Sequence, residues 1–209
     1  MNELNFIHRF VDGDGNNPLT LLLLHGTGGD EDSLLDLGGQ LATGAALLSP
    51  RGKVLENGYP RFFRRLAEGV FDIEDLKART HELADFIDQA VENYHIDRSK
   101  LVAVGYSNGA NIAASTLLLR PGVIPNAILF RSMLPLEPET PPQLTGTQVL
   151  MTGGRFDNMI PAALTEQLAT LLKDAGADVV LDWQQIDHRL TMHDVETAQK
   201  WIVEKTAVK

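Results

Sequence analysis

Residues 101–110 read LVAVGYSNGA and give the clearest indication of how the chain folds. Four apolar residues of strand length, 101–104, lead into a G-x-S-x-G motif centred on Ser107, and Ala-rich sequence of helical character follows. This order of strand, motif and helix is typical of a nucleophile elbow, a cramped turn that lifts a serine hydroxyl clear of a sheet. Such a turn leaves no space for side chains two positions before and after the serine, where this sequence has Gly105 and Gly109. Ser107 is therefore the candidate nucleophile.

Outward from this motif, short apolar runs alternate with longer segments of helical period. The alternation predicts an α/β fold with a mostly parallel, twisted sheet of about seven strands flanked by helices. The strands are expected at residues 4–11, 19–24, 45–48, 101–104, 127–130, 148–152 and 178–183, the second returning antiparallel to the first. Asp72 is expected to cap one helix, and Thr191 with Asp194 forms a capping box for the last. No linker or repeat divides the chain, so residues 1–209 are predicted to form one domain.

Composition excludes several classes of function. The 209 residues contain 18 Lys+Arg and 28 Asp+Glu, a formal net charge of -10, which disfavours nucleic acid or an anionic membrane as the main partner. The chain has no cysteine, which excludes disulfides, thiolate nucleophiles and Cys-ligated metal centres. The longest apolar run, 19–24, is far shorter than the roughly 20 residues that span a bilayer. Residues 1–6 lack the pattern of a signal peptide, so a cytoplasmic location is predicted.

A serine hydroxyl needs a base to become a nucleophile. In folds with this elbow the acid and then the histidine follow the serine along the chain. Four of the six histidines precede Ser107, which leaves His188 and His193. His193 falls in the first turn of the last predicted helix, whereas His188 lies in the loop before it. His188 is thus the preferred base, and His193 is the alternative.

The third partner should be an acid at the end of a strand that precedes the histidine. Asp157 follows the strand 148–152 and a Gly-Gly turn, and its carboxylate would fix the tautomer of the imidazole. Glu137 and Glu139, which follow the preceding strand, are the alternatives.

Acyl transfer also needs hydrogen-bond donors for the oxyanion. The backbone amide of Asn108, directly after the nucleophile, is one candidate, and the amide of Thr27 in the Gly-rich turn 25–29 is the other. This turn lacks both the third small residue of a dinucleotide fingerprint and a P-loop lysine, which argues against a phosphate site. No metal and no organic cofactor is expected.

These motifs together resemble the small carboxylesterase/phospholipase group of α/β-hydrolases, which includes acyl-protein thioesterase-like enzymes. The similar stretches LHGTGGD, GYSNGAN, GGRFDNMIP and HRLT span nearly the whole chain, and residues 61–72 resemble a bacterial esterase branch associated with handling hydroquinones and other aromatic compounds. The resemblance implies an α/β-hydrolase fold, a triad and an oxyanion hole at the same five positions, namely Ser107, Asp157, His188, Thr27 and Asn108. It makes a homodimer plausible. One departure is Asp187, where the family usually has glycine; its charge would favour the imidazolium form of His188, or its side chain would constrain the loop.

The expected function is that of a serine hydrolase acting on small carboxylic esters or thioesters through an acyl-enzyme. The loop after the strand 127–130 is too short for a helical lid, so an open site is expected. We expect five residues to form an apolar wall of the site, although packing in the core is at least as good an interpretation for each: Phe62, Phe63, Met133, Leu134 and Met159. Arginines that would bind an acidic substrate group, or more simply form salt bridges, are Arg51, Arg64 and Arg131. The rival functions are a non-catalytic ligand-binding module and a lactonase or peptidase on the same fold.

Overall fold

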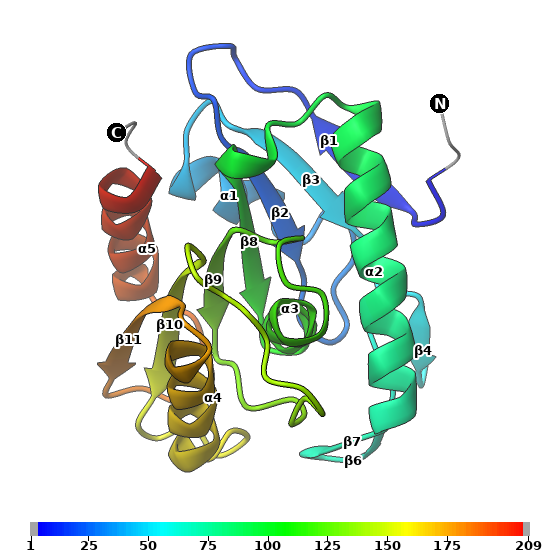
Figure 1. The fold of residues 1–209 in the computed structure, drawn as a ribbon, viewed down its shortest axis with the longest axis vertical. Coiled ribbons are helices and arrows are strands. Elements are labelled where there is room, and N and C mark those ends of the chain that lie inside the picture. The colour runs from blue at the N-terminus through cyan, green and yellow to red at the C-terminus, as the bar shows by residue number, and fades with distance from the viewer. Residues whose placement is uncertain (1–3, 207–209) are drawn as a thin grey trace.

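The computed structural model describes residues 4–206, which form a seven-stranded sheet in the order β1-β3-β2-β8-β9-β10-β11 (Figure 1). The strands are β1 (His8–Val11), β2 (Thr20–Leu24), β3 (Ala46–Pro50), β8 (Leu101–Tyr106), β9 (Asn126–Phe130), β10 (Gln148–Gly154) and β11 (Asp178–Gln184). Every pairing is parallel except that of β1 with β3. The prediction of a mostly parallel sheet of about seven strands is confirmed. Residues 1–3 and 207–209 of the predicted domain 1–209 lie outside the described residues.

The first two strands differ from the prediction in their pairing. β2 does run antiparallel to β1, but the two are not neighbours, because β3 lies between them. All five residues of β2 are buried, whereas β1 alternates between exposed and half-buried residues. A strand buried on both faces is best placed inside a sheet and a half-exposed strand at its edge, and this burial pattern accounts for the order.

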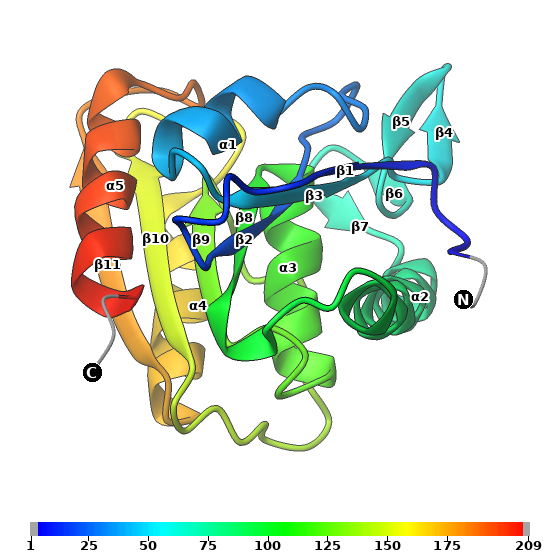
Figure 2. The ribbon, with the colours of Figure 1, turned by 90° about the horizontal axis from the view of Figure 1, so that it is seen from above.

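Helices cover both faces of the sheet (Figure 2). α1 (Leu35–Leu41) and α5 (Met192–Thr206) pack on one face, over a core that includes Leu21, Val104 and Trp201. α2 (Ile73–Asn93), α3 (Asn108–Leu119) and α4 (Ala162–Asp174) pack on the other face. A short 3-10 helix, Arg98–Lys100, precedes β8. The described part of the chain thus has the layers of an α/β-hydrolase fold.

Both predicted helix caps are present. The Asp72 carboxylate accepts a hydrogen bond from the Asp75 amide at the start of α2. At the start of α5 the Thr191 amide donates to Asp194 Oδ2 at 2.8 Å, and the Asp194 amide donates back to Thr191 Oγ1 at 3.4 Å. These reciprocal bonds satisfy amides that a helix N-terminus otherwise leaves unpaired.

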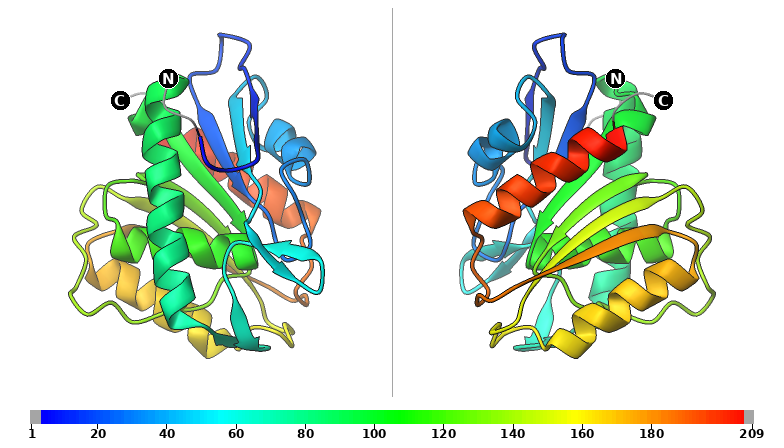
Figure 3. Two further views of the ribbon diagram at one scale, coloured as in Figure 1. Left: turned by 90° about the vertical axis from the view of Figure 1, so that its right-hand side faces the viewer. Right: turned by 90° about the vertical axis from the view of Figure 1, so that its left-hand side faces the viewer.

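Two small antiparallel hairpins were not predicted. They are β4 (Val54–Glu56) with β5 (Tyr59–Arg61), and β6 (Arg65–Ala67) with β7 (Val70–Phe71). Figure 3 shows them at the end of the molecule toward which the parallel strands point, on the same side as the loop that follows β10. Within residues 4–206 no helix has the length and apolar character needed to cross a membrane.

Candidate active site

Ser107 is the residue between β8 and α3, and its backbone has φ 53° and ψ -111°. This left-handed φ is unusual for a residue with a Cβ, and such strain is typical of functional turns. The turn is held by hydrogen bonds from the Ser107 amide to the Phe130 carbonyl and from the Asn111 amide to the Ser107 carbonyl, both 2.9 Å. A Cβ at Gly105 would lie 2.6 Å from the backbone of Ala110, so glycine is required where the elbow closes.

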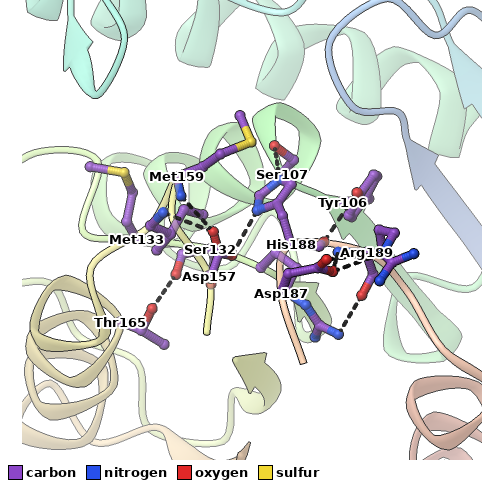
Figure 4. Close-up of polar contacts among 12 residues, drawn as sticks. Tyr106, Ser107, Ser132, Met133, Asp157, Met159, Thr165, Asp187, His188 and Arg189 are labelled. Carbon is purple, nitrogen blue, oxygen red and sulfur yellow. Dashed lines mark hydrogen bonds and ion pairs between the residues drawn. The ribbon is translucent and has the colours of Figure 1, made fainter. Parts of the chain in front are cut away.

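Three parallel strands bring the predicted triad together at their carboxyl ends. Ser107 follows β8, Asp157 follows β10 and His188 follows β11. His188 Nε2 lies 2.9 Å from Ser107 Oγ, and His188 Nδ1 lies 2.7 Å from Asp157 Oδ2. Figure 4 shows the three side chains in sequence, with the imidazole between the hydroxyl and the carboxylate. The arrangement links an acid, a base and a hydroxyl in one chain of hydrogen bonds.

The Asp157 carboxylate is held on its other side by backbone amides. Its Oδ1 accepts hydrogen bonds from the amides of Met159 at 2.8 Å and Ile160 at 3.0 Å. The Asp157 side chain is 2% exposed, against 16% for that of His188. Because both carboxylate oxygens are bonded and shielded from water, the orientation of Oδ2 toward the imidazole is fixed.

The alternative acids and base lie elsewhere. His193 is 59% exposed, and its Nε2 lies 3.4 Å from Asp182. Glu139 is exposed and pairs with Lys77, and Glu137 lines a cavity beside α4. None of the three has a contact with Ser107 in the described structure.

Thr27 and Asn108, the residues with the two predicted oxyanion amides, both border the cavity at Ser107. Asn108 is the first residue of α3, so its amide has no partner within the helix. In the turn after β2, the Gly28 amide bonds the Pro60 carbonyl and the Gly29 amide bonds the Gly26 carbonyl. Within residues 4–206 neither the Thr27 amide nor the Asn108 amide has a backbone acceptor.

His25, which was not predicted to have a role, organises this turn. Its Nδ1 lies 2.7 Å from the Gly26 carbonyl, and its Nε2 accepts a hydrogen bond from the Gly52 amide at 2.9 Å. The ring is thus assigned as the neutral tautomer with the proton on Nδ1. Burial lowers the pKa of His25, which favours that neutral form. Nothing in the sequence separates this histidine from a catalytic one except its place before the serine.

Arg61 is the second residue missed by the sequence interpretation. Its buried guanidinium donates from Nη1 to Thr27 Oγ1 at 2.9 Å and from Nε to the Phe63 carbonyl at 3.2 Å, and it lies 3.1 Å from Glu56. Burial lowers the pKa of Arg61 from its usual value. Arg61 therefore connects the β4–β5 hairpin to the turn 25–29 that contains Thr27, a contact between segments that no local pattern reveals.

The cavity at Ser107 has a volume of about 50 Å³ and is bordered by two of the five predicted wall residues, Met133 and Met159. Phe62 and Phe63 are instead 3% and 0% exposed members of the hydrophobic core, so the alternative of core packing holds for both. Leu134 lines a separate cavity of about 770 Å³ between the loop 134–142 and α4, away from Ser107. The unpredicted hairpin β6–β7 adds a further part of the lining, through Arg65, Glu68, Gly69 and Phe71.

The predicted alternative of salt bridges holds for the three arginines. Arg51 pairs with Glu31, Arg64 with Asp72, and Arg131 with Asp194. None of the three borders the Ser107 cavity.

Asp187 is bound by its neighbour rather than by the imidazole. The amide and Nε of Arg189 both lie 3.0 Å from Asp187 Oδ1 (Figure 4). These hydrogen bonds lower the pKa of the Asp187 carboxyl. The contact favours the expectation that Asp187 constrains the loop, because the imidazole nitrogen Nδ1 faces Asp157.

No cluster of three or more His, Cys, Asp or Glu side chains able to hold a metal ion occurs in the described part of the chain.

Comparison with known proteins identifies the family. The family model for phospholipase/carboxylesterase matches residues 7–206, nearly the whole chain. The chain belongs to the phospholipase/carboxylesterase family. It is 47% identical over 197 residues to the hydrolase MhqD of Bacillus subtilis (strain 168), covering 94% of this chain and 98% of that protein. The family resemblance noted in the sequence is thereby confirmed.

Solved structures agree with this assignment. A Bacillus cereus carboxylesterase superposes with a TM-score of 0.93 at 45% identity, covering 96% of this chain and 95% of that one. A carboxylesterase from Mesorhizobium loti superposes with a TM-score of 0.91 at 30% identity, covering 97% of each chain. The chain is an esterase-type enzyme of the α/β-hydrolase fold.

Proposed function

We propose that this enzyme is a serine carboxylesterase that cleaves small carboxylic esters or thioesters through an acyl-enzyme on Ser107. The observation that carries the proposal is the pair of contacts at His188, 2.9 Å to Ser107 Oγ and 2.7 Å to Asp157 Oδ2. A histidine between a strained serine and a buried carboxylate has the geometry required for general-base activation of the hydroxyl.

In the proposed reaction Ser107 Oγ attacks the carbonyl carbon while His188 Nε2 takes the hydroxyl proton. Asp157 keeps the other imidazole proton on Nδ1 and stabilises the imidazolium that forms. The negative charge on the carbonyl oxygen is met by the amides of Thr27 and Asn108. His188 then gives its proton to the departing alcohol or thiol, leaving an ester on Ser107.

Deacylation repeats these roles with water. His188 removes a proton from a water molecule that attacks the Ser107 ester, and returns that proton to Ser107 Oγ as the acid leaves. The same three side chains therefore act in both steps. No metal or organic cofactor is part of this mechanism.

The experiment compares Ser107→Ala with Ser132→Ala on p-nitrophenyl acetate. Ser132 follows the neighbouring strand, and its buried Oγ has no hydrogen-bond partner among residues 4–206, so it is a matched control. We expect kcat of Ser107→Ala to fall by about 10⁴- to 10⁶-fold, with loss of labelling by a fluorophosphonate probe, and Ser132→Ala to keep both. Turnover by Ser107→Ala close to that of the wild type would contradict the proposal.

A substrate panel separates this activity from a lactonase or peptidase on the same fold. It compares acetate esters, longer acyl esters, acyl thioesters, lactones and peptides at equal enzyme concentration. We expect the acyclic esters or thioesters to have the highest kcat/KM, and a preference for lactones or peptides would contradict the proposed substrate class.

A further inference from the structure

A buried ion pair lies below the loop that carries His188, outside the proposed triad. The Arg131 and Asp194 side chains are 0% and 1% exposed. Their contact is bidentate, with Arg131 Nη1 2.8 Å from Asp194 Oδ1 and Arg131 Nη2 2.8 Å from Asp194 Oδ2. Two parallel hydrogen bonds of this kind fix the relative orientation of both groups.

The backbone places Arg131 at the same level of the sheet as Ser107. Tyr106 and Phe130 are register partners on β8 and β9, and the residue after each has a left-handed backbone, with φ 53° at Ser107 and 55° at Arg131. Left-handed φ is uncommon for residues other than glycine. Each strand is thus followed by a strained residue that is bonded to the neighbouring strand. The Ser107 amide donates to the Phe130 carbonyl, and the Arg131 amide donates to the Thr152 carbonyl.

The same pair is bonded to the loop between β11 and α5. Arg131 Nη2 donates to the Arg189 carbonyl at 2.8 Å, directly after His188. Asp194 Oδ2 accepts from the Thr191 amide, and Asp194 Oδ1 accepts from Gln184 Nε2 at 2.7 Å. The pair is therefore bonded to Gln184 at the end of β11, to Arg189 within the loop and to Thr191 at the end of the loop.

A further bond holds the loop from the side of the nucleophile. Tyr106 Oη donates to the His188 carbonyl at 3.2 Å. The carbonyls of His188 and Arg189 are thus bonded to Tyr106 and Arg131, which flank the ends of β8 and β9. Since the imidazole extends from this short stretch of backbone, its distance to Ser107 depends on both anchors.

The lowered pKa of Asp194 favours its ionised form, as expected for an ion pair with Arg131. Burial acts to raise the pKa of Asp194, but hydrogen bonds from Arg131, Thr152 and the Thr191 amide outweigh it and hold the pKa below its usual value. Desolvation makes buried ion pairs weak contributors to stability compared with apolar side chains of similar size. What such a pair supplies in addition is a defined geometry.

We propose that Arg131 and Asp194 are positioning residues that hold the His188 loop so that the imidazole reaches Ser107 Oγ. This inference rests on the proposed function and adds to it a role for two residues outside the triad. Arg131 contributes through the Arg189 carbonyl, and Asp194 through both the loop end and Arg131. Neither touches the substrate.

The test replaces the pair by apolar side chains, Arg131→Met together with Asp194→Leu, and measures kcat, KM and thermal unfolding. Exchange of a buried ion pair for apolar residues often preserves stability, whereas loss of orientation by about 1 Å can cost a factor on the order of 10² in rate. We expect kcat to fall by about 10- to 100-fold, KM to change by less than a factor of two, and the variant to remain folded at the assay temperature. Wild-type kcat in the folded double variant would overturn the proposal.

Asp194→Asn provides a second variant if the double variant does not fold. Its side-chain oxygen retains one acceptor for the start of α5, but it loses the charge and the bidentate contact with Arg131. We expect a lower kcat at an unchanged KM. A folded Asp194→Asn enzyme with wild-type kcat would also overturn the positioning role.

Thr80→Val is the control for a purely structural effect. It removes a buried hydrogen bond of 2.8 Å between Thr80 Oγ1 and Ser115 Oγ, which joins α2 to α3 away from the His188 loop. We expect a lower Tm with kcat unchanged, and a loss of kcat matching that of the Arg131 variants would contradict a role specific to the loop. Ser107→Ala, assayed beside them, separates the two hypotheses, because retained activity there contradicts the proposed function itself.

Discussion

Gly109 lies directly against the backbone at the end of β2, so closely that a Cβ at this position would be 1.9 Å from the Leu24 carbonyl oxygen. This contact brings the start of α3 next to the turn that begins at His25. The Asn108 amide precedes Gly109, and the Thr27 amide follows Leu24 by three residues. The missing side chain of one glycine thus sets the spacing of the two proposed oxyanion donors.

Gly109→Ala is therefore expected to damage both stability and catalysis. A methyl group has no space beside the Leu24 backbone, and overpacking of this kind typically costs about 1–3 kcal/mol or more in the free energy of unfolding. Urea unfolding and kcat on p-nitrophenyl acetate measure the two effects. Gly39→Ala is the matched control, because a Cβ at Gly39 in α1 meets nothing within 4 Å. Equal stability of the two variants would contradict the packing argument.

Asp157→Asn tests the role of the acid. The substitution keeps the size of the side chain but allows an amide to face His188 Nδ1, which favours the tautomer with the proton on Nε2. We expect kcat to fall by about 10⁴-fold with little change in Tm, measured by steady-state kinetics and thermal unfolding. A drop of less than tenfold would remove Asp157 from the mechanism.

The pH dependence of stability should contain a contribution from His25. Burial lowers the pKa of His25 in the folded protein, so the unfolded chain binds a proton more readily as pH falls below about 6.5. The stability that neutral His25 provides is fully present above that pH and is lost as pH falls toward the folded pKa. We expect His25→Asn to reduce the slope of unfolding free energy against pH between 5 and 6.5 by up to about 1.4 kcal/mol per pH unit. An unchanged slope in urea titrations would contradict the assignment of a neutral, buried ring.

Met133→Ala tests which residues limit the size of the acyl group. Met133 borders the small cavity at Ser107, and its amide is fixed by a 3.0 Å hydrogen bond to Asn111 Oδ1. Truncation should admit longer acyl chains, and each additional buried methylene is worth roughly 0.8 kcal/mol, or about fourfold in kcat/KM. The measurement is the ratio of kcat/KM for butyrate and acetate esters, with Phe62→Leu as a core control outside the cavity. A ratio raised equally by both variants would contradict a role of Met133 in the cavity wall.

Much of the fold was predictable because its signals are local. The strands of the sheet are short apolar runs, and the caps at Asp72 and Thr191 are visible as residue types at fixed spacing. The elbow at Ser107 is a residue pattern at fixed spacing, and the chain order of acid and histidine is a known property of folds with this elbow. The placement of β3 between β1 and β2 was not predictable in the same way, because it depends on which strands need two neighbours.

The parts of the site that were missed depend on contacts between distant segments. Arg61 reaches Thr27 across 34 positions of sequence, and Arg131 reaches Asp194 across 63. Phe62 and Phe63 are buried in the core. No local pattern in the sequence distinguishes an aromatic pair that packs in the core from one that lines a cavity. Residue type and spacing could therefore single out the three side chains that meet at His188, but not the residues that hold them in place.

The most direct test of the central claim is to trap the acyl-enzyme. Wild-type enzyme is mixed with p-nitrophenyl acetate, quenched in acid within the first turnover and digested, and the peptides are analysed by mass spectrometry. We expect a burst of p-nitrophenol and one acetyl group on the peptide that contains Ser107, absent from Ser107→Ala. Release of p-nitrophenol with no acetylated peptide, or with the acetyl group on another residue, would contradict an acyl-enzyme on Ser107.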